Sequence, residues 1–434
     1  MNMIDIILKK RDGFTLTKEE IDFFVQGVTK ETFPDYQASA FLMAVYFSSL
    51  NAEETANLTM SMVHSGTTFD LSSLSGFKVD KHSTGGVADT TTLILAPLVA
   101  SLGVPVVKMS GRGLGFSGGT LDKLDAIPNL STAITQQQAL SYAQQSHIVI
   151  MGQTENLTPA DKRLYALRDV TGTVESLPLI ASSIMSKKIA AGADGIVLDV
   201  KCGSGAFMKD LESAKNLAYC MVEIGKNVGR KVSAVISSME QPLGQNIGNS
   251  LEVIEAMEVL KGNVTGNLLE VSLTLGAYML QLAGKVSTTQ EGKDALLTQI
   301  KNGAGLEKWK EFIIQQGGNP AIIEDYSLLP LSKETHLVLA NEDGYIFSMN
   351  TAEIGHASVV TGAGRLTKEQ PIDLGAGIIM KKQIGDAVKK GDTLAVIHSS
   401  SKEKSSLAGD ILASAITIRP QEPSLPQLIL DVIS

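Results

Sequence analysis

One pattern recurs four times along the middle of the chain: a short apolar segment, a glycine-containing loop, and a segment with helical spacing. The four units begin FKVDKHSTGGVADTT, VPVVKMSGRGLGFSGGT, ADGIVLDVKCGSGAFM and KVSAVISSMEQPLG. Apolar, β-branched strands that alternate with helices are typical of a parallel sheet with helices packed on its faces. The repeat therefore predicts an α/β domain built around a mostly parallel sheet.

The segment before this repeat looks helical. A capping box runs from Thr17 to Glu20, and apolar residues follow at helical spacing. Between the second and third units, Pro178 to Ala191 also looks like a helix, with Gly192 as its terminating residue. We expect this inserted helix to pack with the N-terminal helices, which would make the helical domain discontinuous.

From about Pro330 the chain consists of short strands and turns, as in HLVLANEDGYIFSMN and IIMKKQIGDAVKKGDTLAVIHSSS. The second stretch resembles the barrel of biotinyl and lipoyl carriers. Its Met380-Lys381 pair falls within the expected strand and not at a hairpin tip. The pattern therefore predicts a β-rich domain but does not favour a carrier function.

The expected fold is a multidomain α/β protein. It has a small all-helical domain, a larger domain with a mostly parallel sheet flanked by helices, and a C-terminal α+β domain with a lipoyl-like barrel portion. A chain of 434 residues is too long for one ordinary core. The predicted bounds are 1–66 with 160–192 for the helical domain, 70–159 with 193–329 for the α/β domain, and 330–434 for the C-terminal domain.

The composition narrows the classes of partner. The formal net charge is −9 and no long basic run is present, so nucleic acid is not an expected partner. The N-terminus, MNMIDIILKKRDG, carries charge where an export signal needs a long apolar run, and only two cysteines occur. The most apolar stretch, Leu93 to Val107, is too short and too broken to span a membrane. We expect a cytoplasmic protein.

The first two units carry matching polar loops. Each strand ends in a lysine, Lys81 or Lys108. Glycines let backbone N–H groups approach an anion, helix N-termini favour negative charge, and lysines neutralise it. Since the carboxyl ends of parallel strands share one edge of a sheet, the two loops together predict a phosphate site, although one such loop alone serves equally well as a simple turn. The hydroxyls and glycines that follow the two lysines are Ser83, Thr84, Gly85, Gly86, Ser110, Gly111, Gly113, Ser117, Gly118, Gly119 and Thr120.

Two other phosphate motifs do not fit the chain. The P-loop pattern G-x-x-x-x-G-K-[ST] does not occur. Gly113, Gly115 and Gly118 match G-x-G-x-x-G between a strand and a helix, but a dinucleotide site also needs an acidic residue about 20 positions further on. The chain has Gln136 to Gln138 there. NAD binding is therefore not expected.

Four further residues are candidates for chemistry. His82 lies at a strand end beside Lys81, where it can exchange a proton or simply pack. Ser183 and Lys187 are four residues apart on the inserted helix and share a face, and Arg168 lies shortly before them in the turn LRDVTG. These three side chains suit the carbonyls of a planar base, but a solvent-exposed helical face explains them as well. No histidine pair has metal-ligand spacing, so no catalytic zinc is implied.

Over essentially its whole length the chain resembles the thymidine and pyrimidine-nucleoside phosphorylases. The segments that carry the resemblance are VDKHSTGGVAD, KMSGRGLGFSGGTLDKLDAI, LTPADKRLYALRDVTGTVESLPLIASSIMSKKIAAGADGIVLDVKCGSGAFM, MEQPLGQNIGNSLEVIEAMEVLKG and GAGRLTKEQPIDLGAG. The resemblance implies a homodimer in which the helical domain binds nucleoside and forms the dimer, the α/β domain binds phosphate, and the two domains close to react.

The resemblance also assigns roles to individual residues. Arg168, Ser183 and Lys187 contact the base, with His82 near its O2, and His82, Arg168 and Lys187 form the catalytic set. The phosphate contacts that it implies are Lys81, Ser83, Thr92, Lys108, Ser110 and Thr120. The monovalent cation site that it implies, usually for potassium, comprises Ala88, Thr90, Leu243, Asn246 and Glu255, with Ala88 and Leu243 acting through backbone carbonyls.

Four residues depart from the family pattern. Ala88 replaces a glycine, Phe116-Ser117 replaces histidine-threonine, and Cys202 stands where threonine is common. The backbone ligand at Ala88 is expected to survive if its φ is negative. Because the family histidine ties the closed domains together through a hydrogen bond, we expect Phe116 to close the cleft through apolar contact with Cys202, Phe207 and Met208.

The expected activity is reversible phosphorolysis of uridine, thymidine and deoxyuridine to the free base and a (deoxy)ribose 1-phosphate. Three alternatives stay open: a phosphorylase restricted to thymidine, an enzyme like anthranilate phosphoribosyltransferase, and a non-catalytic nucleoside- or phosphate-binding homologue. The phosphoribosyltransferase would need magnesium and a pyrophosphate-binding acidic pair, and Lys81-His82 stands where that family has a glycine-rich turn.

Overall fold

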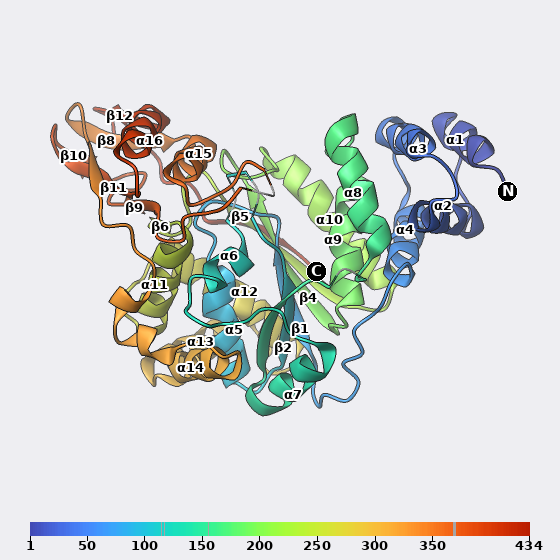
Figure 1. The fold of residues 1–434 in the computed structure, drawn as a ribbon, viewed down its shortest axis with the longest axis horizontal. Helices are drawn as coiled ribbons and strands as arrows, with labels where there is room; N and C mark the ends of the chain where they lie inside the picture. Colours follow the sequence, from blue (N-terminus) through green and yellow to red (C-terminus); the bar gives the residue numbers. More distant parts are fainter. Residues whose placement is uncertain (114, 117, 155, 368–369) are drawn as a thin grey trace.

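A six-stranded sheet forms the centre of the computed structural model, which describes residues 1–434 except 114, 117, 155 and 368–369 (Figure 1). Its strand order is β13-β5-β4-β1-β2-β3, and all neighbours are parallel except β13, which is antiparallel to β5. The strands are β1 (Val79–Ser83), β2 (Val106–Ser110), β3 (Ile148–Gly152), β4 (Gly195–Cys202), β5 (Lys231–Ser238) and β13 (Ile429–Ile433). The four repeated units and the apolar segment HIVIMG thus form the parallel sheet that the sequence predicts.

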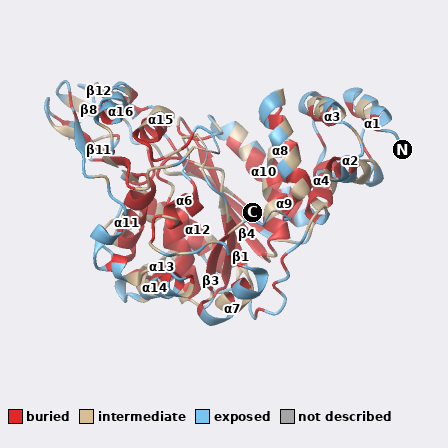
Figure 2. Ribbon diagram, viewed as in Figure 1, coloured by how far each residue is buried: buried red, intermediate tan, exposed pale blue. Residues whose placement is uncertain are grey.

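Alternate residues of each strand pack on opposite faces of this sheet. Val106 of β2 joins one apolar cluster, and Val107 joins the other. The first cluster lies under α5 (Thr91–Ser101), α11 (Asn249–Leu260), α12 (Asn267–Leu282), α13 (Thr289–Lys301) and α14 (Ala304–Gln315). The second lies under α7 (Gln136–Ser146), α9 (Leu177–Ala190) and α10 (Leu211–Asn227). Burial on both faces explains why apolar residues dominate strands such as β3, whose sequence is IVIMG (Figure 2).

The helical part lies beside the sheet and joins two separate segments (Figure 1). Its own apolar cluster draws on all of its helices, which are α1 (Met3–Arg11), α2 (Lys18–Lys30), α3 (Asp35–Ser48), α4 (Ala52–His64), α8 (Pro159–Thr171) and α9. The capping box at Thr17 is present, and α9 ends before Gly192, whose φ is 87°. A side chain at Gly192 would collide with the carbonyl of Phe69, so this turn requires glycine.

The C-terminal part contains two small sheets, of order β10-β8-β12 and β6-β9-β11-β7. Its strands are β7 (Thr335–Leu339), β8 (Gly344–Met349), β9 (Gly377–Met380), β10 (Ala387–Val388), β11 (Thr393–His398) and β12 (Ile416–Arg419), with helices α15 (Thr351–Thr361) and α16 (Lys402–Ala415). Strand β6 (Asn246–Ile247) comes from the α/β part and pairs with β9. The remaining elements of the chain are α6 (Thr120–Leu124) and the short 3-10 turns Pro320–Ile323 and Tyr326–Leu328.

The end of the C-terminal domain needs one correction, while the other domain bounds stay a prediction. Residues 429–433, placed by the sequence in the third domain, form β13 and pair with β5 of the central sheet. The reason is that β5 would otherwise be an unpaired edge, and the apolar C-terminal segment covers it. None of the helices in the described part of the chain is long and apolar enough to cross a membrane.

Candidate active site

The two glycine loops meet at the carboxyl ends of β1 and β2, as their strand positions predict. They line a cavity of about 600 Å³ between the sheet and α9. The cavity is lined by all six residues expected to contact phosphate: Lys81, Ser83, Thr92, Lys108, Ser110 and Thr120. The loops therefore do more than turn the chain. Ser117, the other hydroxyl of the second loop, lies outside the described residues.

A buried carboxylate orients each lysine of the two strands. Lys81 Nζ donates to Thr91 Oγ1 and lies 3.3 Å from Asp199 Oδ2. Lys108 Nζ donates to the carbonyl of Lys81 and lies 3.6 Å from Asp80 Oδ1. Burial, together with the charges of neighbouring lysines, lowers the pKa of Lys108 to about 7. A bound anion would favour the protonated lysine, so the cavity is suited to take up negative charge.

Sequence analysis missed one lysine and the carboxylates that support this cluster. Lys188 lines the same cavity, and its Nζ lies 2.9 Å from Asp80 Oδ2. Asp80 thus links Lys108 and Lys188, while fully buried Asp199 also pairs with Lys201. The available signal was that buried lysines need carboxylate partners, and Asp80 directly precedes Lys81.

His82 lines both the cavity at the glycine loops and a second cavity of about 390 Å³. Desolvation, and then the charges of Lys188 and Lys108, hold the pKa of His82 well below its ordinary value. Burial and the lysine charges thus favour the neutral imidazole of His82 while no anion is bound. A neutral ring still has one N–H group that can donate to a carbonyl oxygen.

The second cavity contains the three residues expected to hold the base. Arg168, Ser183 and Lys187 all line it, and Arg168 and Ser183 are buried, so a solvent-exposed face is wrong as an explanation. Lys187 Nζ lies 2.7 Å from Asp161 Oδ2 and donates to Ser183 Oγ over 3.2 Å. The remaining walls are largely apolar, and they include Tyr165, Val174, Ile180, Ile184, Phe207 and Leu217.

The sequence suggested that Arg168 lies in a turn before the inserted helix, but it lies in the last turn of α8. The helix continues to Thr171, and Gly172, whose φ is 66°, caps its C-terminus. The Arg168 guanidinium donates to the carbonyls of Thr173, Val174 and Leu179. These bonds fix the side chain at the cavity wall and also join α8 to α9.

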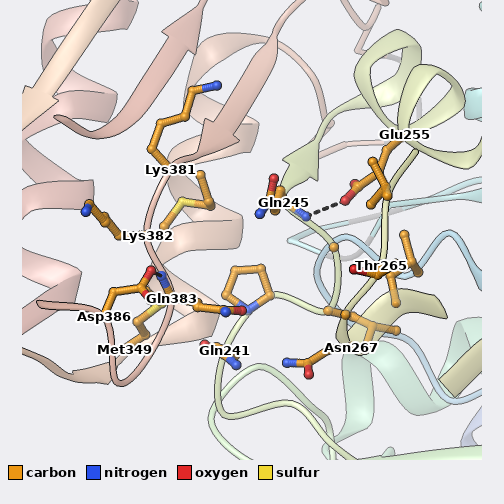
Figure 3. Close-up of a pocket in the computed structure, with 17 residues that line it drawn as sticks. Gln241, Gln245, Glu255, Thr265, Asn267, Met349, Lys381, Lys382, Gln383 and Asp386 are labelled. Carbon is orange, nitrogen blue, oxygen red and sulfur yellow. Dashed lines mark hydrogen bonds between the residues drawn. The ribbon is translucent and has the colours of Figure 1, made fainter. Parts of the chain in front are cut away.

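The segments expected to hold a monovalent cation lie together beside the contact between the α/β and C-terminal parts. Glu255 accepts a hydrogen bond from the backbone N–H group of Gln245 at 2.7 Å (Figure 3) and another from that of Asn246 at 2.9 Å. The carbonyl of Ala88 accepts from Gly244 N at 3.3 Å. Burial raises the pKa of Glu255 to about 7. Leu243 borders the same pocket, whereas the Thr90 hydroxyl donates to Glu252 and not to Glu255.

The backbone conformation of Ala88 differs from the expected one. Its φ is 55°, in the left-handed region, and not negative as the preserved backbone ligand was expected to require. An alanine pays a conformational cost there that a glycine avoids. Its carbonyl nevertheless keeps its place beside Gly244.

The position of Phe116 also differs from the one that the sequence predicted. Its ring packs against His356 of α15, with ring centroids 5.6 Å apart, and it belongs to the apolar cluster of the C-terminal part. Its expected partners belong to other parts of the structure: Cys202 and Met208 join the apolar cluster under α10, and Phe207 lines the second cavity. The loop that carries Phe116 turns toward α15 because Gly355 leaves room for it there.

A fold with two glycine loops facing a helical insertion, and with separate helical and α/β domains, is that of the glycosyl transferase family whose models match this chain. Residues 4–66 match the helical bundle domain of the glycosyl transferase family, and residues 75–306 match its α/β domain. Residues 345–419 match the pyrimidine nucleoside phosphorylase C-terminal domain.

Curated relatives give the narrower assignment. The pyrimidine-nucleoside phosphorylase of Geobacillus stearothermophilus is 54% identical over 438 residues, and the alignment covers all of both chains. That of Staphylococcus aureus (strain N315) is 54% identical over 434 residues, also covering all of both chains. The chain belongs to the pyrimidine-nucleoside phosphorylase family.

A solved structure shares the fold at greater distance. Anthranilate phosphoribosyltransferase from Thermus thermophilus superimposes with a TM-score of 0.60 at 18% identity, covering 72% of this chain and 99% of that chain. At this identity the likeness concerns the fold alone. It gives no support to phosphoribosyl transfer as the activity.

Proposed function

We propose that this protein catalyses the reversible phosphorolysis of uridine, thymidine and deoxyuridine. One observation carries the proposal: a lysine-lined anion cavity opens, through His82 and Lys187, into a cavity with polar groups and apolar walls suited to a planar base. The names of the relatives support the same substrate class.

The arrangement suggests how the reaction proceeds. A phosphate oxygen attacks C1′ of the sugar while the bond from C1′ to the base nitrogen breaks, and the electron pair of that bond stays with the base. Lys81, Lys108 and the hydroxyls around them orient the nucleophile. Lys187 and Arg168 stabilise negative charge on the base carbonyls, and neutral His82 donates a hydrogen bond to O2.

Base release measured with each nucleoside across a range of phosphate concentrations tests this function. Release should saturate with phosphate for all three nucleosides. Activity with thymidine and deoxyuridine but not uridine would favour the thymidine-restricted alternative. Binding of nucleoside without base release would favour a non-catalytic homologue, and either outcome contradicts the broad activity.

A homodimer is part of the proposal. Large apolar side chains lie exposed on the helical domain, as expected of a protein-binding surface; they include Ile4, Phe14, Tyr36, Phe47 and Val170. Light scattering should report twice the chain mass. A cytoplasmic location is also proposed, and the two free cysteines, Cys202 and Cys220, suit a reducing compartment.

A potassium ion is the remaining element of the proposal. Buried Glu255 has no lysine or arginine within ion-pair distance among the described residues, so a cation at this position would offset its charge. Glu255 would hold the ion together with backbone carbonyls of Ala88 and Leu243 and the side-chain oxygens of Thr90 and Asn246. The ion would stabilise the contact between the two loops and the C-terminal part. It would take no part in the phosphorolysis reaction itself.

The raised pKa of Glu255 predicts a pH-dependent cation affinity. A carboxyl group whose pKa is higher in the folded protein destabilises the fold as pH rises from the ordinary Glu value toward about 7. Potassium must displace the proton, so its apparent affinity should fall about tenfold between pH 8 and pH 6. Thermal denaturation with KCl against tetramethylammonium chloride measures this. Stabilisation by potassium that is unchanged over this pH range, or that persists in Glu255→Gln, would contradict the assignment.

A further inference from the structure

Arg365, in the C-terminal part of the chain, forms hydrogen bonds with the second glycine loop, which follows β2. Arg365 follows α15, and its guanidinium donates to Gly113 O (3.2 Å) and to Asp122 Oδ1 (2.7 Å). Its own backbone carbonyl accepts from Gly115 N at 3.0 Å. Arg365 thus bonds the glycine loop through side chain and backbone together, although 250 residues of chain separate Gly115 from it.

Asp122 accepts hydrogen bonds from both Arg365 and the glycine loop. It is buried at the start of the short helix α6, and its Oδ2 accepts from Gly113 N at 2.7 Å. Gly119 lies so close to Gly113 that a side chain there would collide with Gly113 N. The start of the loop at Gly113 and its end at Gly119 are therefore in contact. Asp122 binds the N–H group of Gly113, and Arg365, from the C-terminal part, binds its carbonyl.

Arg365 does not itself reach the anion. The phosphate cavity is lined by the loop residues Gly111, Arg112, Gly113, Gly118, Gly119 and Thr120, but Arg365 is not among its lining residues. The side chain is about one-tenth exposed. A buried arginine is costly unless it is paired. Because its two terminal nitrogens donate to two different acceptors, the orientation of the planar guanidinium is fixed as well as its distance. Its partners are groups of the loop whose backbone surrounds the proposed phosphate site.

We propose that Arg365 is a positioning residue through which the C-terminal domain holds the second glycine loop in its anion-binding form. The inference rests on the proposed phosphate site. The Arg365 side chain acts on phosphate indirectly, through Gly113 and Asp122. Its loss should therefore weaken phosphate binding and leave the base cavity, on the far side of His82, nearly unchanged.

Steady-state kinetics of Arg365→Met with both substrates varied tests the proposal, alongside calorimetric titration of inorganic phosphate alone. The KM for phosphate should rise roughly tenfold or more, while the KM for uridine changes less than about twofold. Arg365→Lys keeps the charge but has a single nitrogen in place of the two that donate to Gly113 O and Asp122 Oδ1, so it should recover only part of the loss. The matched control Arg419→Met, an exposed arginine on β12 of the same domain, should behave like the unmodified protein.

An equal rise of both KM values, or unchanged phosphate affinity at an unchanged melting temperature, would overturn the proposal. If Arg365→Met does not fold, Arg365→Gln allows the same measurement. The titration separates this inference from the proposed function. Without any phosphorolysis by the unmodified protein the proposed function fails, whereas the comparison of phosphate affinity between the unmodified protein and the variant still decides the role of Arg365.

Discussion

Replacing Lys108 with methionine should lower kcat/KM for phosphate by at least about a hundredfold, because the variant loses a buried cation that faces the nucleophile. The methionine keeps most of the volume of the side chain, so packing around β2 should survive. The exposed Lys226→Met on α10 serves as the control and should leave both kinetic constants unchanged.

Proton uptake on phosphate binding gives a second test of the role of Lys108. Since this pKa lies at about 7 before phosphate binds, much of Lys108 is neutral at pH 8. An arriving anion raises the pKa, so phosphate binding at pH 8 should take up a proton, detected as a dependence of the binding enthalpy on the ionisation enthalpy of the buffer. Lys108→Met should abolish this uptake. The same proton uptake in the variant would show that another group carries it.

Replacing Lys187 with methionine should lower kcat/KM for the nucleoside by roughly a hundred- to a thousandfold, since its ammonium group stabilises charge that develops only as the base departs. Asp161 and Ser183 hold Nζ at the junction of the two cavities. Phosphate affinity of the free enzyme, measured by calorimetry, should change less than about twofold.

Two comparisons make the Lys187 test specific. The exposed Lys162→Met on α8, in the same helical domain, should have no effect. An activated nucleoside such as 5-fluorouridine, whose base leaves more readily, should lose less activity than uridine. Phosphate binding lost with nucleoside binding kept would reverse the assignment of the two cavities.

Strand periodicity explains why much of the site could be predicted. Successive residues of a strand point to opposite faces, so in VDKHS the residues Val79 and Lys81 face α5 while Asp80 and His82 face α9. Two adjacent parallel strands then bring Lys81 and Lys108 to one edge. Spacing in the sequence alone was sufficient for this inference.

The parts that were missed depend on contacts between distant segments. Nothing near Lys188 in the chain shows that Asp80 is its partner 108 residues away. The positive φ of Ala88 and the packing of Phe116 on α15 likewise follow from how the C-terminal part docks on the loops. The return of β13 to the central sheet is also a tertiary effect, because β13 lies outside the four repeated units.

Phosphate as the nucleophile is the central claim, and isotope labelling tests it most directly. Uridine is incubated with the protein and inorganic phosphate in which every oxygen is ¹⁸O, and the sugar product is analysed by mass spectrometry and ³¹P NMR. Attack on C1′ by a phosphate oxygen predicts ribose 1-phosphate that retains all of the label, including the bridging oxygen. Free ribose, or base release at an equal rate without phosphate, would contradict the account.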